Sequence, residues 1–151
     1  MNTNRPIPER VPCLALNPPY AGLLFGENGK PGRKSLESRT WEWPYSPGWC
    51  AIYATKAVDR EAVTRLGLIA TPHTQPIGCI IGIVWFDVSR PMTADDTDGA
   101  CYPFWQDRFV WPILESRRFA VPDRDHLKRG PQKFVYVPRA VIMAGLQGID
   151  S

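Results

Sequence analysis

The 151-residue chain is poor in the residues that build metal centres and disulfide frameworks. It has two histidines, His73 and His126, and four widely spaced cysteines without a C-x-x-C pair. No His or Cys lies at zinc-ligand spacing from another, so no metal site is expected. A domain of this size needs no disulfide, so the cysteines should be free, buried thiols. No cofactor is expected either.

Long hydrophobic runs are also absent. The longest apolar stretch, residues 77–86, is far shorter than the roughly 20 residues that span a bilayer. The first ten residues lack the apolar core of a signal peptide. We therefore expect a cytoplasmic protein with no membrane association.

Breakers of regular helix are plentiful, since the chain has 16 prolines and 12 glycines. This excludes a helical bundle and favours an α+β domain, for which 44% hydrophobic residues supply a core. Residues 1–12 are polar and proline-rich and are predicted to be an N-terminal tail. Residues 13–151 are predicted to form one domain, and a monomer is expected.

The hydrophobic pattern predicts about six strands and two short helices. The strand at 78–88, rich in Ile and Val, should be central in the sheet. Residues 90–104 are polar and should form an excursion with an acidic loop. The helices are predicted at 20–25 and 59–68, and the six strands at 13–16, 49–55, 78–88, 108–114, 119–121 and 134–137.

Positive charge gathers in two stretches of the sequence, residues 30–39 and 108–133, although the net charge is only +3. Such a balance permits binding to a polyanion without requiring it. The stretches are either a basic side of the molecule or ordinary solvated surface.

Common phosphate-binding and nucleophile motifs are not present. The glycine-rich segment 26–35 lacks the glycine and lysine spacing of a P-loop and of a dinucleotide fingerprint. No serine lies in a nucleophile elbow. The remaining candidates are the charged residues that follow this segment.

Those residues carry a resemblance to a known family. Gly32, Lys34, Glu37 and Arg39 match the G-x-K-x-x-E-x-R signature of the ASCH family in the PUA-like superfamily. Residues 19–21, Pro-Tyr-Ala, resemble the start of that family's first helix, and 77–87 is similar to its long central strand. The loop 27–33 is longer than usual in the family, and residues 90–104 have no counterpart.

The resemblance implies a small twisted β-barrel with short packed helices and a cleft lined by the signature strand. Members resemble RNA-binding or RNA-modification modules, and a few small relatives are amidohydrolases that act on an acetylated cytidine through a lysine, a threonine and a glutamate. Lys34 matches that lysine. Glu37 stands at the place of the threonine, and the downstream glutamate has no match, so the deacetylase function loses its nucleophile.

The chemistry of the residues suggests a binding site. Glu37, Arg39 and Trp41 should share one face of a strand, and Lys34 joins them only if the chain bends as it enters the strand. Arg33, Lys34 and Arg39 could then bind phosphate or carbonyl groups, with Glu37 positioning them or accepting from a base amine. Tyr20 and Trp41 could stack on a base. In the alternative interpretation Glu37 and Arg39 form a structural pair, Trp41 is core and Tyr20 packs the helix.

We therefore predict an ASCH-like protein that binds RNA or a modified nucleoside through Tyr20, Arg33, Lys34, Glu37, Arg39 and Trp41. The first alternative is a hydrolase, either an amidohydrolase on a modified base or a ribonuclease, with Lys34 and Glu37 as catalytic residues. The second is a protein-interaction module that regulates transcription or translation.

Overall fold

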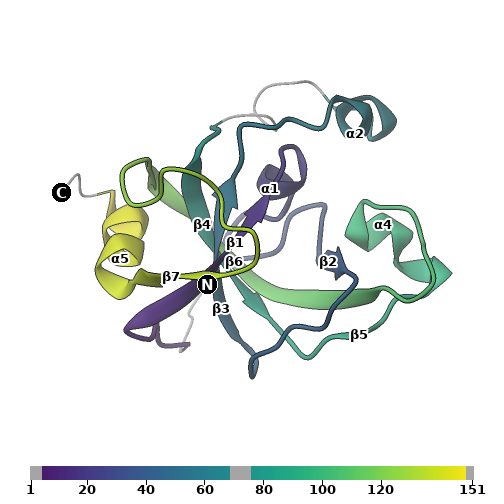
Figure 1. Cartoon of the computed structure of the whole chain (residues 1–151), viewed down its shortest axis with the longest axis horizontal. Coiled ribbons are helices and arrows are strands. Elements are labelled where there is room, and N and C mark those ends of the chain that lie inside the picture. Colours follow the sequence, from purple (N-terminus) through teal and green to yellow (C-terminus); the bar gives the residue numbers. More distant parts are fainter. Residues whose placement is uncertain (1–4, 69–75, 149–151) are drawn as a thin grey trace.

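The structure is a computed structural model that describes residues 5–68 and 76–148. His73 and Pro72 lie outside the described residues. Seven strands form one mixed sheet with the order β2-β6-β4-β3-β1-β7, and β5 pairs with β6 (Figure 1). Strands β1 and β3 are parallel, and the other pairs are antiparallel. The strands are β1 (Arg10–Leu16), β2 (Leu36–Arg39), β3 (Gly48–Ala54), β4 (Cys79–Phe86), β5 (Arg90–Pro91), β6 (Phe109–Asp123) and β7 (Val135–Pro138).

The α+β class is confirmed, but the sheet does not close into a barrel. Within the described residues, β2 and β7 lie at the two ends of the strand order and do not pair with each other. A side chain crosses the gap instead, because Arg39 Nη2 on β2 donates to the carbonyl oxygen of Ala15 on β1 at 3.2 Å. The curved sheet therefore has an open side where β1 and β2 approach each other.

Both faces of the sheet are buried along its central strands. On β3, Cys50 and Ile52 point into one hydrophobic core, called the first core. Trp49 and Tyr53 point to the opposite face of the sheet, into the second core. Strand β4 lies between β3 and β6 and is buried along nearly its whole length, which confirms its predicted central position. Two buried faces explain why these strands read as continuous apolar runs.

Strand β6 is a single strand of 15 residues where two separate strands were predicted. Its first half pairs with β2 and β5, and its second half pairs with β4. Register shifts between β4 and β6 fall at Ile80/Gly82 and Trp85/Phe86. Such bulges increase local twist and allow β6 to bend around the first core. Strand β2, which pairs with the first half of β6, therefore lies at the open side of the sheet.

The helices are short and lie around the sheet (Figure 1): α1 (Tyr20–Leu23), α2 (Arg60–Arg65), the 3₁₀ turn η1 (Ala94–Asp96), α4 (Thr97–Ala100) and α5 (Arg139–Gln147). Helices α1 and α2 confirm the predicted ones, and the Asp59 side chain caps α2 by accepting from the backbone N–H of Ala62 at 3.0 Å. Helix α5 was not predicted. It packs against the second core through Ile142 and Gly145, and a Cβ at Gly145 would lie 2.2 Å from the Phe119 ring. No helix in the described ranges is long and apolar enough to cross a membrane.

The excursion between β5 and α4 folds back over β2. The two terminal nitrogens of the Arg90 guanidinium, Nη1 and Nη2, each donate to the Asp96 carboxylate at 2.8 Å, and this carboxylate also accepts from the backbone N–H of Thr93. The backbone N–H of Ser35 donates to the carbonyl of Gly99 at 2.9 Å, which fixes α4 beside the start of β2. In the acidic loop, Asp96 is therefore buried and stabilises the fold, while Asp95 and Asp98 are exposed.

The N-terminal segment contacts the sheet. Strand β1 begins at Arg10, within the range predicted as a tail, and pairs with β7. Arg5 forms an ion pair of 2.6 Å with Glu115 on β6, and its carbonyl accepts from the Trp49 indole at 3.2 Å. All four cysteines are buried and unbridged.

Candidate functional site

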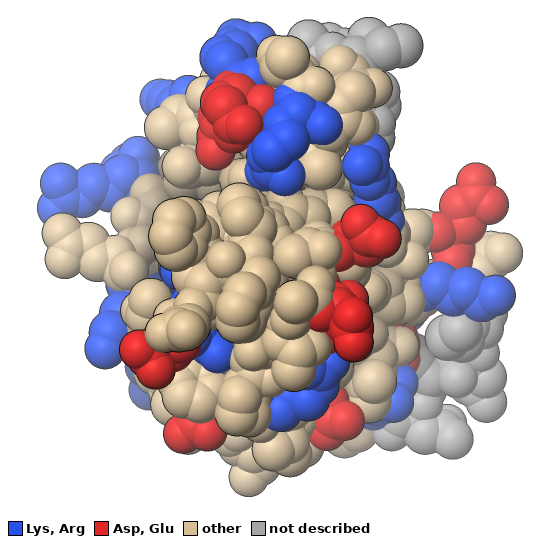
Figure 2. Space-filling model, turned by 90° about the vertical axis from the view of Figure 1, so that its right-hand side faces the viewer, with Lys and Arg blue, Asp and Glu red and all other residues tan. Residues whose placement is uncertain are grey.

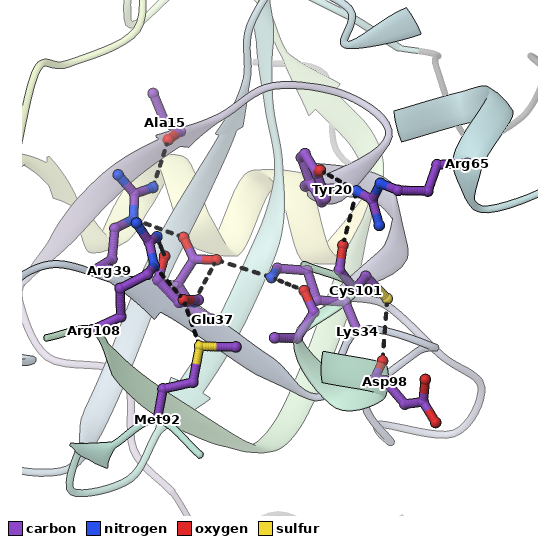
Figure 3. A network of polar contacts seen from close by, with 12 residues as sticks. Ala15, Tyr20, Lys34, Glu37, Arg39, Arg65, Met92, Asp98, Cys101 and Arg108 are labelled. Carbon is purple, nitrogen blue, oxygen red and sulfur yellow. Dashed lines mark hydrogen bonds and ion pairs between the residues drawn. The ribbon is translucent and has the colours of Figure 1, made fainter. Parts of the chain in front are cut away.

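A cleft of about 230 Å³ lies at the open side of the sheet, between the end of β1, the start of α1 and strand β2. Segments far apart in the sequence supply its walls, as the close-up of Figure 3 shows. The side chains that matter for its chemistry are Tyr20, Lys34, Glu37, Arg39, Tyr102 and Arg108. The structure thus brings four of the six predicted binding residues together.

Lys34 enters the cleft through the bend that the sequence required. Its backbone N–H donates to Leu23 O on α1 at 3.0 Å, and β2 begins only at Leu36. The ammonium Nζ donates to the carbonyl of Ala100 at 2.6 Å and lies 3.2 Å from Glu37 Oε1. Lys34 is only 2% exposed, so its ammonium group has little contact with solvent. Ala100 O and the Glu37 carboxylate compensate for the lost hydration of its charge.

Glu37 lies between two cations. Its Oε2 accepts from Arg39 Nε at 2.8 Å, and its Oε1 faces Lys34 Nζ. Burial raises the pKa of the Glu37 carboxyl, but the charges and hydrogen bonds of Lys34 and Arg39 outweigh it, so this pKa lies below its ordinary value. Glu37 is therefore a carboxylate at neutral pH.

Arg108 completes the positive wall of the cleft. Its Nε donates to Ser38 Oγ at 2.8 Å and its Nη2 to Ser38 O at 2.7 Å, so the guanidinium is fixed against β2. The guanidinium carbon also lies 4.8 Å from the centre of the Tyr102 ring. Arg108 belongs to the second basic stretch of the sequence but was not among the predicted site residues.

Two tyrosines form the aromatic part of the cleft. The rings of Tyr20 and Tyr102 are 6.1 Å apart with an interplanar angle of 64°. Lys34 Nζ lies 5.5 Å from the centre of the Tyr20 ring, and the Tyr20 hydroxyl accepts from Arg65 Nη2 at 2.7 Å. Tyr102 was missed, because it follows α4 in a segment without a regular pattern.

The two remaining predicted residues lie elsewhere. Trp41 is not a lining residue of the cleft, and its ring packs edge-on against Trp111 and Phe134 at 5.0 and 5.4 Å. Arg33 lines a second cavity of about 550 Å³, which shares Tyr102 with the cleft. The alternative interpretation of Trp41 as a packing residue fits this placement.

The metal-ligating side chains and the thiol beside the cleft bear on the chemistry open to the site. Over residues 5–68 and 76–148, no three His, Cys, Asp or Glu side chains are grouped so that they could hold a metal ion. Cys101 lies next to the cleft, and burial raises the pKa of its thiol above the ordinary value despite the nearby cations. A thiol with a raised pKa is a poor nucleophile at neutral pH.

Comparisons with known proteins agree with the architecture. No protein-family model matches the chain, and no curated protein matches it. Solved structures do match: a serine-to-alanine mutant of ASCH from Zymomonas mobilis superposes with a TM-score of 0.57 at 16% identity, covering 96% of this chain and all of that one. The ASCH structure from the same organism has a TM-score of 0.56 at 14% identity and covers 93% of this chain and 95% of its own. A tyrosine-to-phenylalanine mutant of that protein has a TM-score of 0.53 at 13% identity and covers 93% of this chain and 98% of its own. The resemblance inferred from the signature residues is thus confirmed at the level of structure, and the chain has an ASCH-like fold.

Proposed function

We propose that the cleft binds a single nucleobase of RNA or of a modified nucleoside. The observation that supports this most is the combination of two tyrosine rings with the cations of Lys34, Arg39 and Arg108 around one carboxylate. Aromatic rings stack on bases, and cationic donors bind base carbonyl and phosphate oxygens. A volume of about 230 Å³ is below the roughly 300–1,000 Å³ of sites for drug-sized ligands, so it suits one base rather than a longer segment.

Each charged group has a separate task in this proposal. An ammonium has three donors, and the two partners of Lys34 within the described residues leave one for a ligand oxygen. Glu37 neutralises part of the positive charge and orients Lys34 and Arg39. Arg108 packs against Tyr102 and supplies a further cation to the wall of the cleft.

A hydrolase is the second candidate, because a buried lysine and glutamate lie 3.2 Å apart at the cleft. The lowered pKa of Glu37 argues against it. A general base works best with a pKa near the operating pH, whereas Glu37 is stabilised as a carboxylate by two cations. Binding is therefore the function that the charges favour.

Calorimetric titration with the four ribonucleosides and short single-stranded RNA tests the proposal. Lys34→Ala should weaken binding about 10-fold or more, because a charge-assisted hydrogen bond is lost. Glu37→Gln should have a smaller effect on the affinity of the folded protein. Lys30→Ala is the matched control: Lys30 is exposed and lies outside the cleft, so affinity should be unchanged.

The same variants separate binding from catalysis. Circular dichroism must first show that each variant is folded. Incubation with acetylated cytidine and with RNA then measures turnover. Turnover that falls about 100-fold in Lys34→Ala or Glu37→Gln with nearly unchanged affinity would establish the hydrolase instead. Equal affinity of wild type and Lys34→Ala would contradict the proposed site.

A further inference from the structure

The second cavity, beside the cleft, has a composition that suits an anion. It encloses about 550 Å³ between α2, α4 and the segment before β2. Arg33 and Arg65 line it together with Thr97, Asp98, Cys101 and Tyr102. Two arginines and one aspartate are therefore among the residues that line this cavity.

Both arginines are held in place from one side. Arg33 Nη1 donates to Leu66 O at 2.8 Å. Arg65 Nη2 donates to the Tyr20 hydroxyl at 2.7 Å and to Cys101 O at 3.3 Å, and its Nε pairs with Glu61 at 3.3 Å. A guanidinium has five donors, so each arginine keeps donors for a ligand within the described part of the chain.

The cavity and the cleft are joined through two tyrosines. Tyr102 lines both, and the Tyr20 ring lies between Lys34 in the cleft and Arg65 in the cavity. Figure 3 shows this sequence of side chains from Glu37 through Lys34 and Tyr20 to Arg65. A ligand whose base enters the cleft would therefore place its sugar beside Tyr20 and its next charged group near Arg65.

We infer that the cavity binds the phosphate adjoining the base held in the cleft, so that the ligand is a nucleotide or an RNA chain rather than a free nucleoside. This inference rests on the proposed function. Arginine binds phosphate through paired donors. Arg33 and Arg65 keep such donors at the cavity, although Asp98 also lines it and Glu61 pairs with Arg65. Arg33, predicted to bind RNA, would then act in this cavity and not in the cleft.

The test compares each ribonucleoside with its 3′- and 5′-monophosphates by calorimetry. At least one monophosphate should bind about 10-fold or more tightly than its nucleoside, which is the expected gain from charge-assisted hydrogen bonds. Arg65→Gln should remove most of this gain. Arg60→Gln is the matched control, since Arg60 is exposed on the same helix but lines neither cavity.

A variant that is expected to bind more tightly serves as a further control, because misfolding would lower the affinity and not raise it. Asp98→Asn removes the carboxylate from the cavity and should tighten binding of the monophosphate without changing that of the nucleoside. In Lys34→Ala both ligands should weaken while the ratio between them persists.

The failures of the two proposals are distinguishable. Nucleoside and monophosphates that bind equally well would overturn the phosphate site and leave the base cleft intact. An affinity ratio that Arg65→Gln does not change would also overturn it. If no nucleoside or nucleotide binds, the proposed function fails and this inference with it, and titration with inorganic phosphate then shows whether an anion site alone remains.

Discussion

Glu37 connects most of the charged groups around the cleft. Its two oxygens contact Lys34 and Arg39, and Oε1 also accepts from the backbone N–H of Ser38 at 3.2 Å. The residue is only 4% exposed, so water does little to screen these contacts. Removing the carboxylate would leave two neighbouring cations with no compensating charge.

Replacing Glu37 by Gln is therefore expected to lower the free energy of unfolding by about 3–5 kcal/mol, the usual cost of breaking a buried ion pair. Urea denaturation measures this. Glu42→Gln, at an exposed carboxylate, should change the stability by less than about 0.5 kcal/mol. Adding Lys34→Met should recover part of the loss, because the unpaired ammonium is gone. A loss below about 1 kcal/mol in Glu37→Gln would show that the pair is not structural.

The residues of the site could be predicted where they fall within the family signature or, for Tyr20, at the start of the helix that the resemblance marks. Lys34, Glu37 and Arg39 fall within one motif, and the structure joins them by ion pairs. Tyr102 and Arg108 reach the cleft from a distant part of the sequence, through the folding of the excursion over β2. No local pattern marks such residues.

At the scale of elements, the excursion 90–104 determines the shape of the site. It supplies Ala100 O, which accepts from Lys34, and Cys101 O, which accepts from Arg65. The pairing of Arg90 with Asp96 closes this segment, and hydrogen bonds from Arg90 hold the pKa of the Asp96 carboxyl at about 2, below the ordinary 3.8. Asp96 thus stabilises the fold as a carboxylate.

The stability of the protein should therefore fall at acid pH in part through Asp96. Because the pKa is lower in the folded state, the contribution is complete above about pH 4 and is lost as the pH falls towards about 2. Thermal unfolding between about pH 5 and 2 measures it. Asp96→Asn should flatten the dependence in this window, whereas Asp95→Asn, at an exposed neighbour, should leave it unchanged. Parallel curves for wild type and Asp96→Asn would contradict this role.

Strand β6 shows why sequence patterns misplace some elements. Polar residues at 115–118 break the apolar pattern, so the sequence indicates two strands. In the structure Glu115 is buried against Arg5, and Ser116 Oγ donates to Lys30 O at 2.6 Å. Contacts from distant segments thus satisfy the polar groups that appeared to interrupt the strand. Helix α5 was missed because it is a short segment of nine residues that contains a glycine, Gly145. In the structure this glycine is needed, because a larger residue would collide with the Phe119 ring.

For the whole molecule, basic side chains on the face seen in Figure 2 do not gather into one continuous patch. Figure 2 shows the side of the molecule on the right of Figure 1, with separate basic and acidic groups around an uncharged centre. The cleft and its neighbouring cavity together contain five cationic side chains and two carboxylates. Five of the 18 Lys and Arg side chains therefore line the two hollows where a phosphorylated ligand would bind.

Binding of short single-stranded RNA should accordingly depend on salt only moderately. Each phosphate contact on a single strand contributes a slope of about −0.7 in a plot of log affinity against log salt. One or two contacts at Arg33 and Arg65 predict a slope between about −0.7 and −1.4. Fluorescence anisotropy at several salt concentrations measures it. A slope steeper than about −4 would instead indicate binding along a broad basic surface.

Base binding in the cleft is tested most directly by a crystal structure of the protein soaked with the ribonucleotide that binds most tightly. A base is expected in the cleft, in contact with Tyr20 and within hydrogen-bond distance of Lys34 Nζ. The Lys34→Ala protein, soaked in the same way, should show the cleft without that base. A ligand bound away from the cleft, or one bound there equally well without Lys34, would contradict base binding by this cleft.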